Sequence, residues 1–321
     1  MPLSERSLIA QIRRSAGSSK ALVRGIGDDC AVLQLPRGHQ ALVTTDFSLE
    51  GVHFRREWYS PESVGHRCAT RGLSDIAAMG GRPLAVFVSV ALPANTSQKW
   101  VDKFSSGLLA AIKAAGATLA GGDTAQSPSH ILADVVVLGS LPAGTAVLRS
   151  GAKPGDRIFV TGTLGLPSTA VNLLLGGVRK KLNPKHYRKL FFPEARVAVG
   201  EWLREHRLAT AMIDLSDGLS TDLSHICEES VVGAEIYAST LPPADIPGRP
   251  AHPDLHHVLH GGDEYELLFT VRPGRRVPRS IAGVPVTEIG SIVAGKRILL
   301  VAGDGSRREL RAQGWEHFRA S

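Results

Sequence analysis

The chain has 321 residues, of which 43% are hydrophobic and 21% are charged, and its formal net charge is +7. This composition is that of an ordinary globular protein, long enough for two domains, and it excludes disordered and fibrous classes. No apolar run approaches the roughly 20 residues that a membrane helix needs, and residues 1–16 lack the apolar core of a secretory signal. We therefore expect a cytoplasmic protein without membrane contacts.

The three cysteines and the basic clusters indicate no further class. Cys30, Cys68 and Cys227 are widely spaced, so they match neither a disulfide framework nor a zinc site. The basic clusters at 179–181, 275–276 and 307–308 lack interleaved aromatic residues, and no nucleic-acid-binding motif occurs. We expect reduced thiols, solvated surface charge and no nucleic-acid partner, while the positive balance suits anionic phosphate ligands.

In the first half of the chain, hydrophobic spacing predicts alternating strands and helices. Strands at 31–35 and 40–45 are expected to pair around a turn at 36–38 and to bring Asp46 to the end of the second strand. A helix should begin at the N-cap residue Ser60 and end before Gly80. The other expected elements are helices at 4–14 and 97–115, strands at 83–92 and 131–139, and a short strand at 117–120 that opens into Gly121-Gly122-Asp123.

Between residues 142 and 155 the composition turns to Gly, Pro and small residues, so we place a domain boundary after residue 145. The alternation then begins again and predicts a second α+β layer. Its expected strands lie at 157–160, 210–213, near 235, 265–271, 286–289 and 297–301, and its helices at 166–175, 193–205 and 219–229.

Short acidic motifs recur along both halves, each pairing Asp with Gly or a small hydroxyl residue. Such carboxylates can bind Mg²⁺, and the glycines let backbone N–H groups approach phosphate oxygens. The same dipeptides also mark ordinary turns. Several of the acids follow apolar runs, as Asp214 follows Ile213, where an unpaired charge is costly. The motifs are Gly27-Asp28-Asp29, Thr44-Thr45-Asp46, Ser74-Asp75, Gly121-Gly122-Asp123, Gly155-Asp156, Asp214-Leu215-Ser216-Asp217-Gly218, Asp222 and Gly261-Gly262-Asp263-Glu264.

This pattern favours a Mg²⁺-polyphosphate enzyme, but not of the two commonest ATP-using designs. The chain contains no Gly-x-x-x-x-Gly-Lys-[Ser/Thr] loop and no His-Arg-Asp or Asp-Phe-Gly motif. Carboxylates from both domains would instead converge on a cleft and hold several Mg²⁺ ions around a triphosphate.

Seven motifs, in this order, carry a resemblance to a known family. They are Gly25-Ile-Gly-Asp-Asp-Cys-Ala31, Thr44-Thr-Asp46 with Glu50-Gly-Val-His-Phe54, Leu73-Ser-Asp-Ile-Ala-Ala-Met-Gly80, Gly121-Gly-Asp-Thr124, Arg149-Ser-Gly-Ala-Lys-Pro-Gly-Asp156, Ile213-Asp-Leu-Ser-Asp-Gly-Leu219 and Gly261-Gly-Asp-Glu-Tyr-Glu-Leu-Leu-Phe269. In these residues, and from the opening helix to Trp315, the chain resembles the thiamine-monophosphate kinase family. That family shares a superfamily with aminoimidazole ribonucleotide synthetase and selenophosphate synthetase.

The resemblance implies a two-domain α+β fold. An N-terminal α/β domain, residues 1–145, would bind ATP and Mg²⁺ and form a homodimer through its sheet. A C-terminal α/β domain, residues 146–321, would complete the substrate cleft. The implied reaction is ATP-dependent phosphorylation of thiamine monophosphate to thiamine diphosphate, by in-line transfer assisted by several Mg²⁺ ions.

The resemblance also implies roles for individual positions. Matching positions imply Mg²⁺ ligands at Asp29, Thr44, Thr45, Asp46, Asp75, Asp123, Asp214 and Asp217. They imply ATP contacts at Gly122, Asp123, Arg149 and Ser216, and acceptor contacts at His53, Asp263 and Trp315. No catalytic base is expected, because the attacking phosphate oxygen is already ionised at neutral pH.

For three of these residues the sequence leaves a simpler role open. Asp75 could form a helix-surface ion pair with Arg71 four residues earlier. His53 could be an exposed side chain beside a turn, and Trp315 could be an aromatic of the tail packed against the second domain.

Three departures from the family pattern stand out. The acids Asp263-Glu264 are in the opposite order to the family's Gly-Gly-Glu-Asp, Gly72 replaces the usual Asn, and Cys30 follows the Asp pair. We expect Cys30 to be a small buried thiol, because no Gly-rich loop of the selenophosphate synthetase kind precedes it.

Three alternative functions remain. The first is another ATP-using enzyme of the superfamily with a different acceptor. The second is a non-catalytic relative of the hydrogenase-maturation proteins, which the absence of a Cys in the tail Trp315–Ser321 disfavours. The third is a basic nucleic-acid binder, which would show strongly salt-dependent binding to DNA.

Overall fold

The computed structural model describes residues 12–17, 19–26, 30–177 and 182–315. The chain divides into two compact units, and it passes from one unit to the other several times along the sequence. The first unit combines Met1–Ile76, Gly81–Thr145 and Phe191–Val197, and the second combines Ala77–Gly80, Ala146–Leu190 and Ala198–Ser321. Nothing in the composition indicated that a short segment near residue 191 returns to the first unit.

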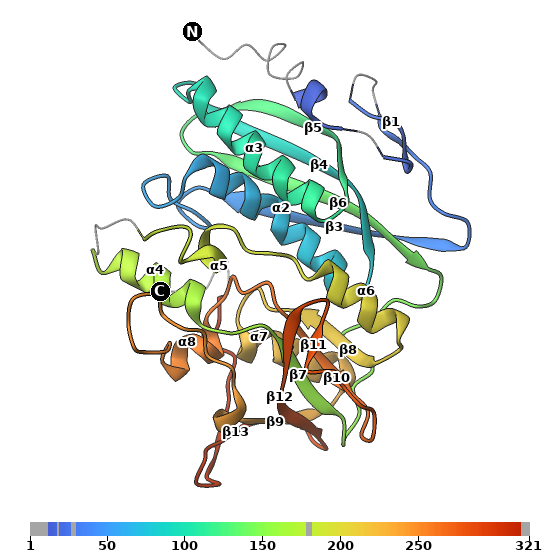
Figure 1. The fold of residues 1–321 in the computed structure, drawn as a ribbon, viewed down its shortest axis with the longest axis vertical. Helices are drawn as coiled ribbons and strands as arrows, with labels where there is room; N and C mark the ends of the chain where they lie inside the picture. The colour runs from blue at the N-terminus through green and yellow to red at the C-terminus, as the bar shows by residue number, and fades with distance from the viewer. Residues whose placement is uncertain (1–11, 18, 27–29, 178–181, 316–321) are drawn as a thin grey trace. The chain divides into compact units, whose positions relative to one another are not determined.

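The first unit is built on a four-stranded sheet in the order β3-β6-β4-β5. β3 (His39–Leu49), β6 (Leu132–Pro142) and β4 (Arg82–Pro93) pair antiparallel, and β5 (Thr118–Ser127) lies parallel to β4 at the edge. Two helices, α2 (Pro61–Ala78) and α3 (Gln98–Ala114), cover one face of this sheet (Figure 1). The opposite face carries Val43 and Phe47, whose side chains are 67% and 55% exposed.

The helices α2 and α3 approach each other closely because glycine stands at their crossing. A Cβ at Gly65 would collide with the Phe104 carbonyl, and a Cβ at Gly107 would collide with the Glu62 carbonyl. At the start of α3, Ser97 accepts a hydrogen bond from the Trp100 backbone N–H at 3.3 Å, which satisfies one of the free donors of the first turn.

Two predicted features of this unit are wrong. β2 (Val32–Leu33) pairs with β1 (Leu22–Arg24) and not with β3, and all eleven residues of β3 pair with the equally long β6. Asp46 therefore lies inside a strand and not at its end. The Gly121-Gly122-Asp123 motif likewise lies within β5, since its backbone pairs with β4 as far as Ser127.

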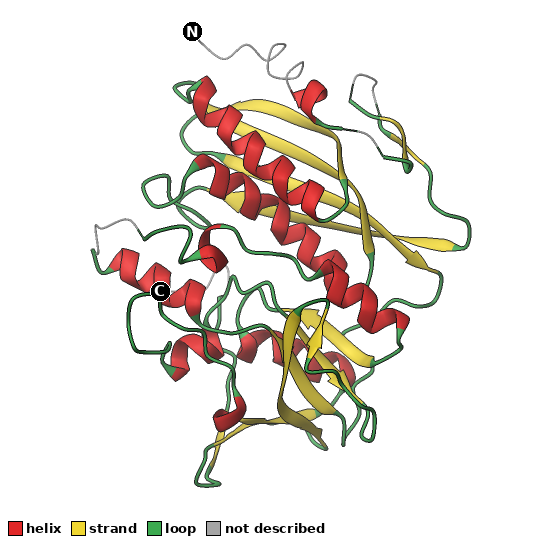
Figure 2. Ribbon diagram, in the orientation of Figure 1, coloured by secondary structure: helices red, strands yellow, loops and turns green. Residues whose placement is uncertain are grey.

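The second unit is built on a larger mixed sheet in the order β14-β13-β9-β12-β7-β10-β8, with β11 paired to β12 (Figure 2). Among the described strands of this sheet, only β13 and β9 pair in parallel. The strands are β7 (Arg157–Thr161), β8 (Ala209–Asp214), β9 (Gly233–Tyr237), β10 (Leu267–Val271), β11 (Ser280–Ile281), β12 (Val284–Val293), β13 (Ile298–Val301) and β14 (Arg307–Glu309).

The helical elements of the second half are α4 (Leu166–Leu175), α5 (Arg188–Phe191), α6 (Val197–Glu205), α7 (Leu219–Ser230), η1 (Ala238–Thr240) and α8 (Leu255–His260). Side chains of β7, β8, β10 and α7, including Ile158, Ile213 and Leu223, form one buried core. The predicted strands and the longer helices occur within a few residues of their expected bounds. α5, α8, β1, β11 and β14 are short elements that hydrophobic periodicity did not indicate.

The opening helix predicted at 4–14 lies mostly outside the described residues, of which 12–15 are helical. In the described part of the chain, no helix is both long and apolar enough to cross a lipid bilayer. Both units combine helices with a mixed sheet, which confirms the expected α+β class.

Candidate functional site

Four polar side chains meet where α2 packs on β3 in the first unit. Thr44 and Asp46 point to the same side of β3, because side chains alternate along a strand. Arg71 and Asp75 are one turn apart on α2. The Arg71 Nε donates to Asp46 Oδ1 at 3.1 Å, and the Thr44 hydroxyl donates a short hydrogen bond to Asp75 Oδ2. Two carboxylates and a hydroxyl are thus gathered beside one guanidinium on the helix-covered face.

The remaining predicted ligands of this unit lie on the other face of the sheet. Thr45 alternates with Thr44, and its hydroxyl donates to Asp134 Oδ1 on β6 at 2.8 Å. Asp123 on β5 pairs in register with Ser89, which in turn pairs with Asp134, so these side chains share a face. The sheet therefore separates Thr45 and Asp123 from Thr44, Asp46 and Asp75.

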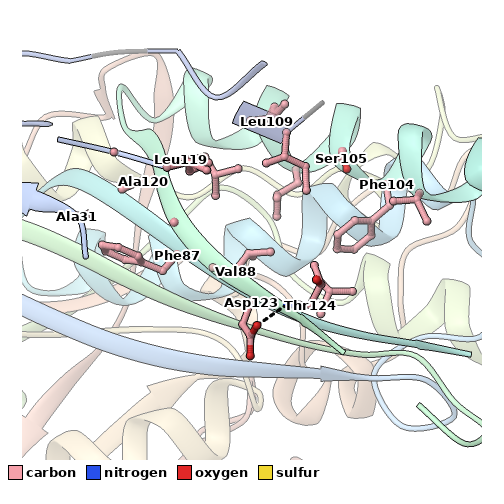
Figure 3. A pocket seen from close by; sticks show the side chains of 18 of the residues that line it. Ala31, Phe87, Val88, Phe104, Ser105, Leu109, Leu119, Ala120, Asp123 and Thr124 are labelled. Atoms are coloured by element: carbon pink, nitrogen blue, oxygen red, sulfur yellow. Dashed lines mark hydrogen bonds between the residues drawn. The ribbon is translucent and has the colours of Figure 1, made fainter. Parts of the chain in front are cut away.

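A cavity of about 700 Å³ lies alongside β5. Figure 3 shows it between Val88 of β4, Leu119 of β5, and Phe104 and Leu109 of α3, while the Asp123 carboxylate points away from α3. Its wall is mostly apolar and includes the predicted ATP contacts Gly122 and Asp123.

One polar atom in the wall of this cavity has no partner. Among the described residues, Thr124 Oγ1 is a buried oxygen without a hydrogen bond. Buried polar atoms are normally paired, so this oxygen could meet a polar atom of a ligand. A side chain at position 122 would collide with the Val88 carbonyl, which explains the glycine there independently of any ligand.

Cys30 also lines this cavity, and it is exposed. The expectation of a buried thiol is wrong, because Cys30 lies in the bend before β2 and not beneath the helices. Asp29 and its neighbour Asp28 lie outside the described residues, so the predicted ligand at position 29 has no structural account.

His53 lies in the turn that follows β3 and is half-buried. Its Nδ1 accepts a hydrogen bond from the Leu49 backbone N–H at 3.0 Å, and the His53 backbone N–H donates to the Leu49 carbonyl at 2.8 Å. In the neutral ring the proton must therefore sit on Nε2, so the turn fixes both the tautomer and the direction of the imidazole. His53 is more firmly placed than a loose surface histidine.

In the second unit, β8 ends at Asp214, which is only 4% exposed, and the loop Leu215–Gly218 leads into α7. Asp222, in the first turn of α7, accepts hydrogen bonds from the backbone N–H groups of Asp217 and Gly218 at 3.2 and 3.0 Å. Burial, followed by the negative charges of Asp214 and Asp217, raises the pKa of Asp222 well above its usual value. Three acidic side chains thus crowd one loop, a setting that a cation would relieve.

Both predicted acceptor residues of this unit are attached to the same loop. The Asp263 N–H donates to the Ser216 carbonyl at 2.8 Å, and the Trp315 N–H donates to the Asp217 carbonyl at 3.1 Å. The Tyr265 hydroxyl donates to Asp263 Oδ1 at 2.7 Å. Asp263 and Tyr265 have φ angles of +64° and +52°, a strained conformation that often marks functional sites. The Trp315 side chain is 52% exposed, so it is not a fully packed tail aromatic.

The acids at positions 263 and 264 have different environments. Glu264 is buried, accepts from the Gly165 N–H and forms an ion pair with Lys189 at 2.9 Å. Lys189 also pairs with the buried Glu266 at 3.0 Å. Burial raises the pKa of Glu264 despite Lys189. Asp263 therefore belongs to the site loop, whereas Glu264 holds that segment in the core.

Arg149, the remaining predicted ATP contact, is exposed on a segment beside β8, where the Leu148 carbonyl accepts from the Met212 N–H at 3.0 Å. Within the described ranges, no three His, Cys, Asp or Glu side chains form a ready-made metal site. The donors present are nonetheless the carboxylate and hydroxyl oxygens that Mg²⁺ prefers.

Comparison with known proteins identifies the family. Residues 27–141 match the model for the AIR synthase related protein N-terminal domain, and residues 153–302 match the model for its C-terminal domain. Thiamine-monophosphate kinase from Escherichia coli (strain K12) is 36% identical, with 99% of both chains aligned. The chain belongs to the thiamine-monophosphate kinase family. As a member, it is a phosphotransferase.

Solved structures of relatives agree with this assignment. The crystal structure of thiamine-monophosphate kinase from Stenotrophomonas maltophilia K279a has a TM-score of 0.83 and 34% identity, covering 95% of this chain and 98% of that one. A structure described as AaThiL complexed with AMPPCP and TMP has a TM-score of 0.76 and 31% identity, covering 98% and 97%. The expected family and fold class are thereby confirmed.

Sequence reasoning overlooked several residues that organise the site. Asp134 could have been found as an acid inside the apolar run Leu132–Leu138. Asp222 was noticed as an acid but given no role. Lys189, Thr221 and Tyr265 act through contacts with residues distant in sequence or at turns, for which the sequence has no local signal.

Proposed function

We propose that this protein phosphorylates thiamine monophosphate to thiamine diphosphate with ATP, assisted by Mg²⁺. The observation that carries the proposal is the likeness over nearly the whole chain to AaThiL complexed with AMPPCP and TMP, at 31% identity. The observed site supports it, because the loop Ser216–Asp217 presents predicted nucleotide and metal contacts and holds two predicted acceptor residues through its carbonyls.

The chain's own residues would act by binding and orientation. The attacking phosphate oxygen of thiamine monophosphate is already ionised, so the enzyme has to overcome the repulsion between two polyanions and align them in line. Exposed Arg149 can clamp phosphate with two N–H groups. His53, whose ring is oriented by its turn, and Asp263, which accepts from Tyr265, would contact the acceptor, as the family pattern implies. The half-exposed Trp315 ring can stack on a cationic thiazolium.

Oxygen donors in each unit would hold Mg²⁺, which would supply charge neutralisation for the phosphates. In the first unit they are Thr44, Asp46 and Asp75 on one sheet face, and Thr45 and Asp123 on the other face, where β6 and β4 lie between their strands. In the second unit they are Asp214 and Asp217. We also infer that Asp29 contributes, as the family pattern implies.

We further infer that the cavity along β5 receives the nucleoside part of ATP. Its apolar wall suits a flat base, and Thr124 Oγ1 offers one hydrogen bond. The sheet face opposite α2 and α3, where Val43 and Phe47 are exposed among the described residues, supports the expected homodimer, because exposed apolar side chains favour burial against a second copy. The cytoplasmic location stays a prediction.

The decisive test is product analysis of the purified protein with ATP, Mg²⁺ and thiamine monophosphate. We expect Mg²⁺-dependent thiamine diphosphate and an equal amount of ADP. If ATP binds and no diphosphate forms, the alternative of another superfamily enzyme with a different acceptor replaces this proposal.

Asp46→Asn tests the metal assignment within this function. We expect the activity to fall by about 100-fold or more, because a charged metal ligand is lost, while the midpoint temperature of thermal unfolding changes little. The matched control is Asp102→Asn on α3, whose carboxylate accepts from Gln98 and lies outside the site. Full activity in a folded Asp46→Asn protein would refute the role of Asp46.

A further inference from the structure

The segment Gln313–Trp315 is fastened to the start of α7, beside the loop of Asp217. The Gly314 N–H donates to the Thr221 hydroxyl at 3.0 Å, and the next N–H, that of Trp315, donates to the Asp217 carbonyl at 3.1 Å. One residue earlier, the Gln313 N–H lies 3.4 Å from the Ser220 hydroxyl. Three successive N–H groups therefore meet acceptors within residues 217–221.

The fit at Gly314 is close. A Cβ there would collide with the Asp217 carbonyl and approach the Thr221 hydroxyl. The contact therefore needs both a glycine on the segment and a small hydroxyl residue on α7. A hydroxyl side chain in the first turn of a helix usually serves the helix itself, whereas Thr221 accepts from a residue more than ninety positions away.

These contacts hold the backbone next to a half-exposed side chain. Trp315 is 52% exposed, so about half of its surface can meet a ligand. The backbone bonds on its N-terminal side help to set the position and direction of the ring. Loss of one of them should allow the ring to sample more positions and weaken any ligand that stacks on it.

We propose that Thr221, together with Gly314, is a positioning residue that sets the affinity for the acceptor by holding Trp315 against the Asp217 loop. The inference rests on the proposed function, in which Trp315 stacks on the acceptor. Asp217 would then serve both substrates, its carboxylate on the metal–nucleotide side and its carbonyl on the acceptor side.

The test combines spectroscopy with kinetics on the full chain. The protein has four tryptophans, so labelling with 5-fluorotryptophan gives four ¹⁹F signals, and Trp315→Phe identifies the one from Trp315. The variants are Thr221→Val, which removes the hydroxyl and keeps the shape, and Thr221→Ser, which restores the hydroxyl. Gly314→Ala disturbs the same contact from the other side, and Thr240→Val is the control, since that exposed hydroxyl donates to the Tyr237 carbonyl elsewhere in the unit.

We expect Thr221→Val and Gly314→Ala to shift and sharpen the Trp315 signal only. The KM for thiamine monophosphate should rise about five- to tenfold, the effect of one hydrogen bond, with kcat and the KM for ATP within about twofold. Thr221→Ser and Thr240→Val should resemble the wild type in both measurements.

Two results would overturn the inference. One is a Trp315 signal that is the same in Thr221→Val and Gly314→Ala as in the wild type. The other is a displaced signal with an unchanged KM for the acceptor. A wild-type protein that forms no thiamine diphosphate would instead refute the proposed function, and with it the acceptor role, while the ¹⁹F signals would still show whether Thr221 fastens Trp315.

Discussion

Each unit carries candidate site residues, and the two units hold them in different ways. In the first unit, polar side chains project from regular strands and a helix, and their carboxylates stay partly exposed, as in the Asp46–Arg71 pair at 25% and 17%. In the second unit, four acids are buried: Asp214 at the end of β8, Asp222 in the first turn of α7, and Glu264 and Glu266 in the segment before β10. The candidate residues of the first unit thus lie on regular elements beside the sheet, whereas the site loop of the second unit is supported by buried acids.

This difference implies that substitutions will separate function from stability in the first unit and confound them in the second. A partly exposed carboxylate can lose its charge with little effect on folding. A buried carboxylate depends on its partner, because an unpaired charge in the interior is expensive. The following experiments test that contrast.

The largest difference in stability is expected between two lysines. Lys189→Met leaves the buried Glu264 and Glu266 without their cation and should reduce the free energy of unfolding by about 3–5 kcal/mol. Lys103→Met in the first unit breaks an exposed pair with Glu62, at 45% and 30% exposure, and should change it by less than about 1 kcal/mol. Urea titrations of both variants measure the free energy of unfolding. Equal losses in the two variants would contradict the proposed difference between the two units.

A smaller effect concerns pH. Because burial and then Asp214 and Asp217 raise the pKa of Asp222 well above its usual value, the folded protein retains a proton that the unfolded chain releases. The folded state therefore loses stability as the pH rises from the unfolded pKa through the raised one, by up to about 1.4 kcal/mol per pH unit.

Asp222→Asn removes that titration and keeps an oxygen acceptor for the two backbone N–H groups. In EDTA-treated protein, we expect the variant to gain stability relative to the wild type as the pH is raised from 5 to 8, as measured by urea unfolding at each pH. A stability difference that does not change with pH would show that Asp222 does not titrate in this way.

The smallest perturbation is chemical labelling of thiols, which requires no change in the core. Burial raises the pKa of Cys68 to about 12, and burial followed by the charge of Glu228 raises that of Cys227 to about 12, whereas Cys30 is exposed. Because the thiolate is the reactive form, iodoacetamide at neutral pH should modify Cys30 alone. Mass spectrometry checks this, with Cys30→Ser as the unreactive control; rapid labelling of Cys68 or Cys227 would contradict it.

The parts of the fold that the sequence predicted are those with strong local signals. The helix α2 was predicted from Ser60, Pro61 and Gly80, and its bounds are Pro61–Ala78. The predicted pairing of β2 with β3 was wrong, because a turn signal at 36–38 does not identify strands that are distant in the sequence. β3 pairs instead with β6, nearly a hundred residues later. The exposed position of Cys30 was likewise missed, since an apolar residue type does not reveal whether a helix covers it.

For the site, the sequence alone determined which residue types are present and in what order: acids beside glycines and hydroxyls, the chemistry of Mg²⁺ and phosphate, and the family they indicate. Only the tertiary structure decided which of them meet. It placed Thr44 with Asp75 and Thr45 with Asp134 on opposite sheet faces, and it joined Asp263 and Trp315 to one loop. The reason is physical: composition and capping act over a few residues, whereas strand pairing and backbone contacts such as Gly314 with Thr221 form between distant segments once the core is packed.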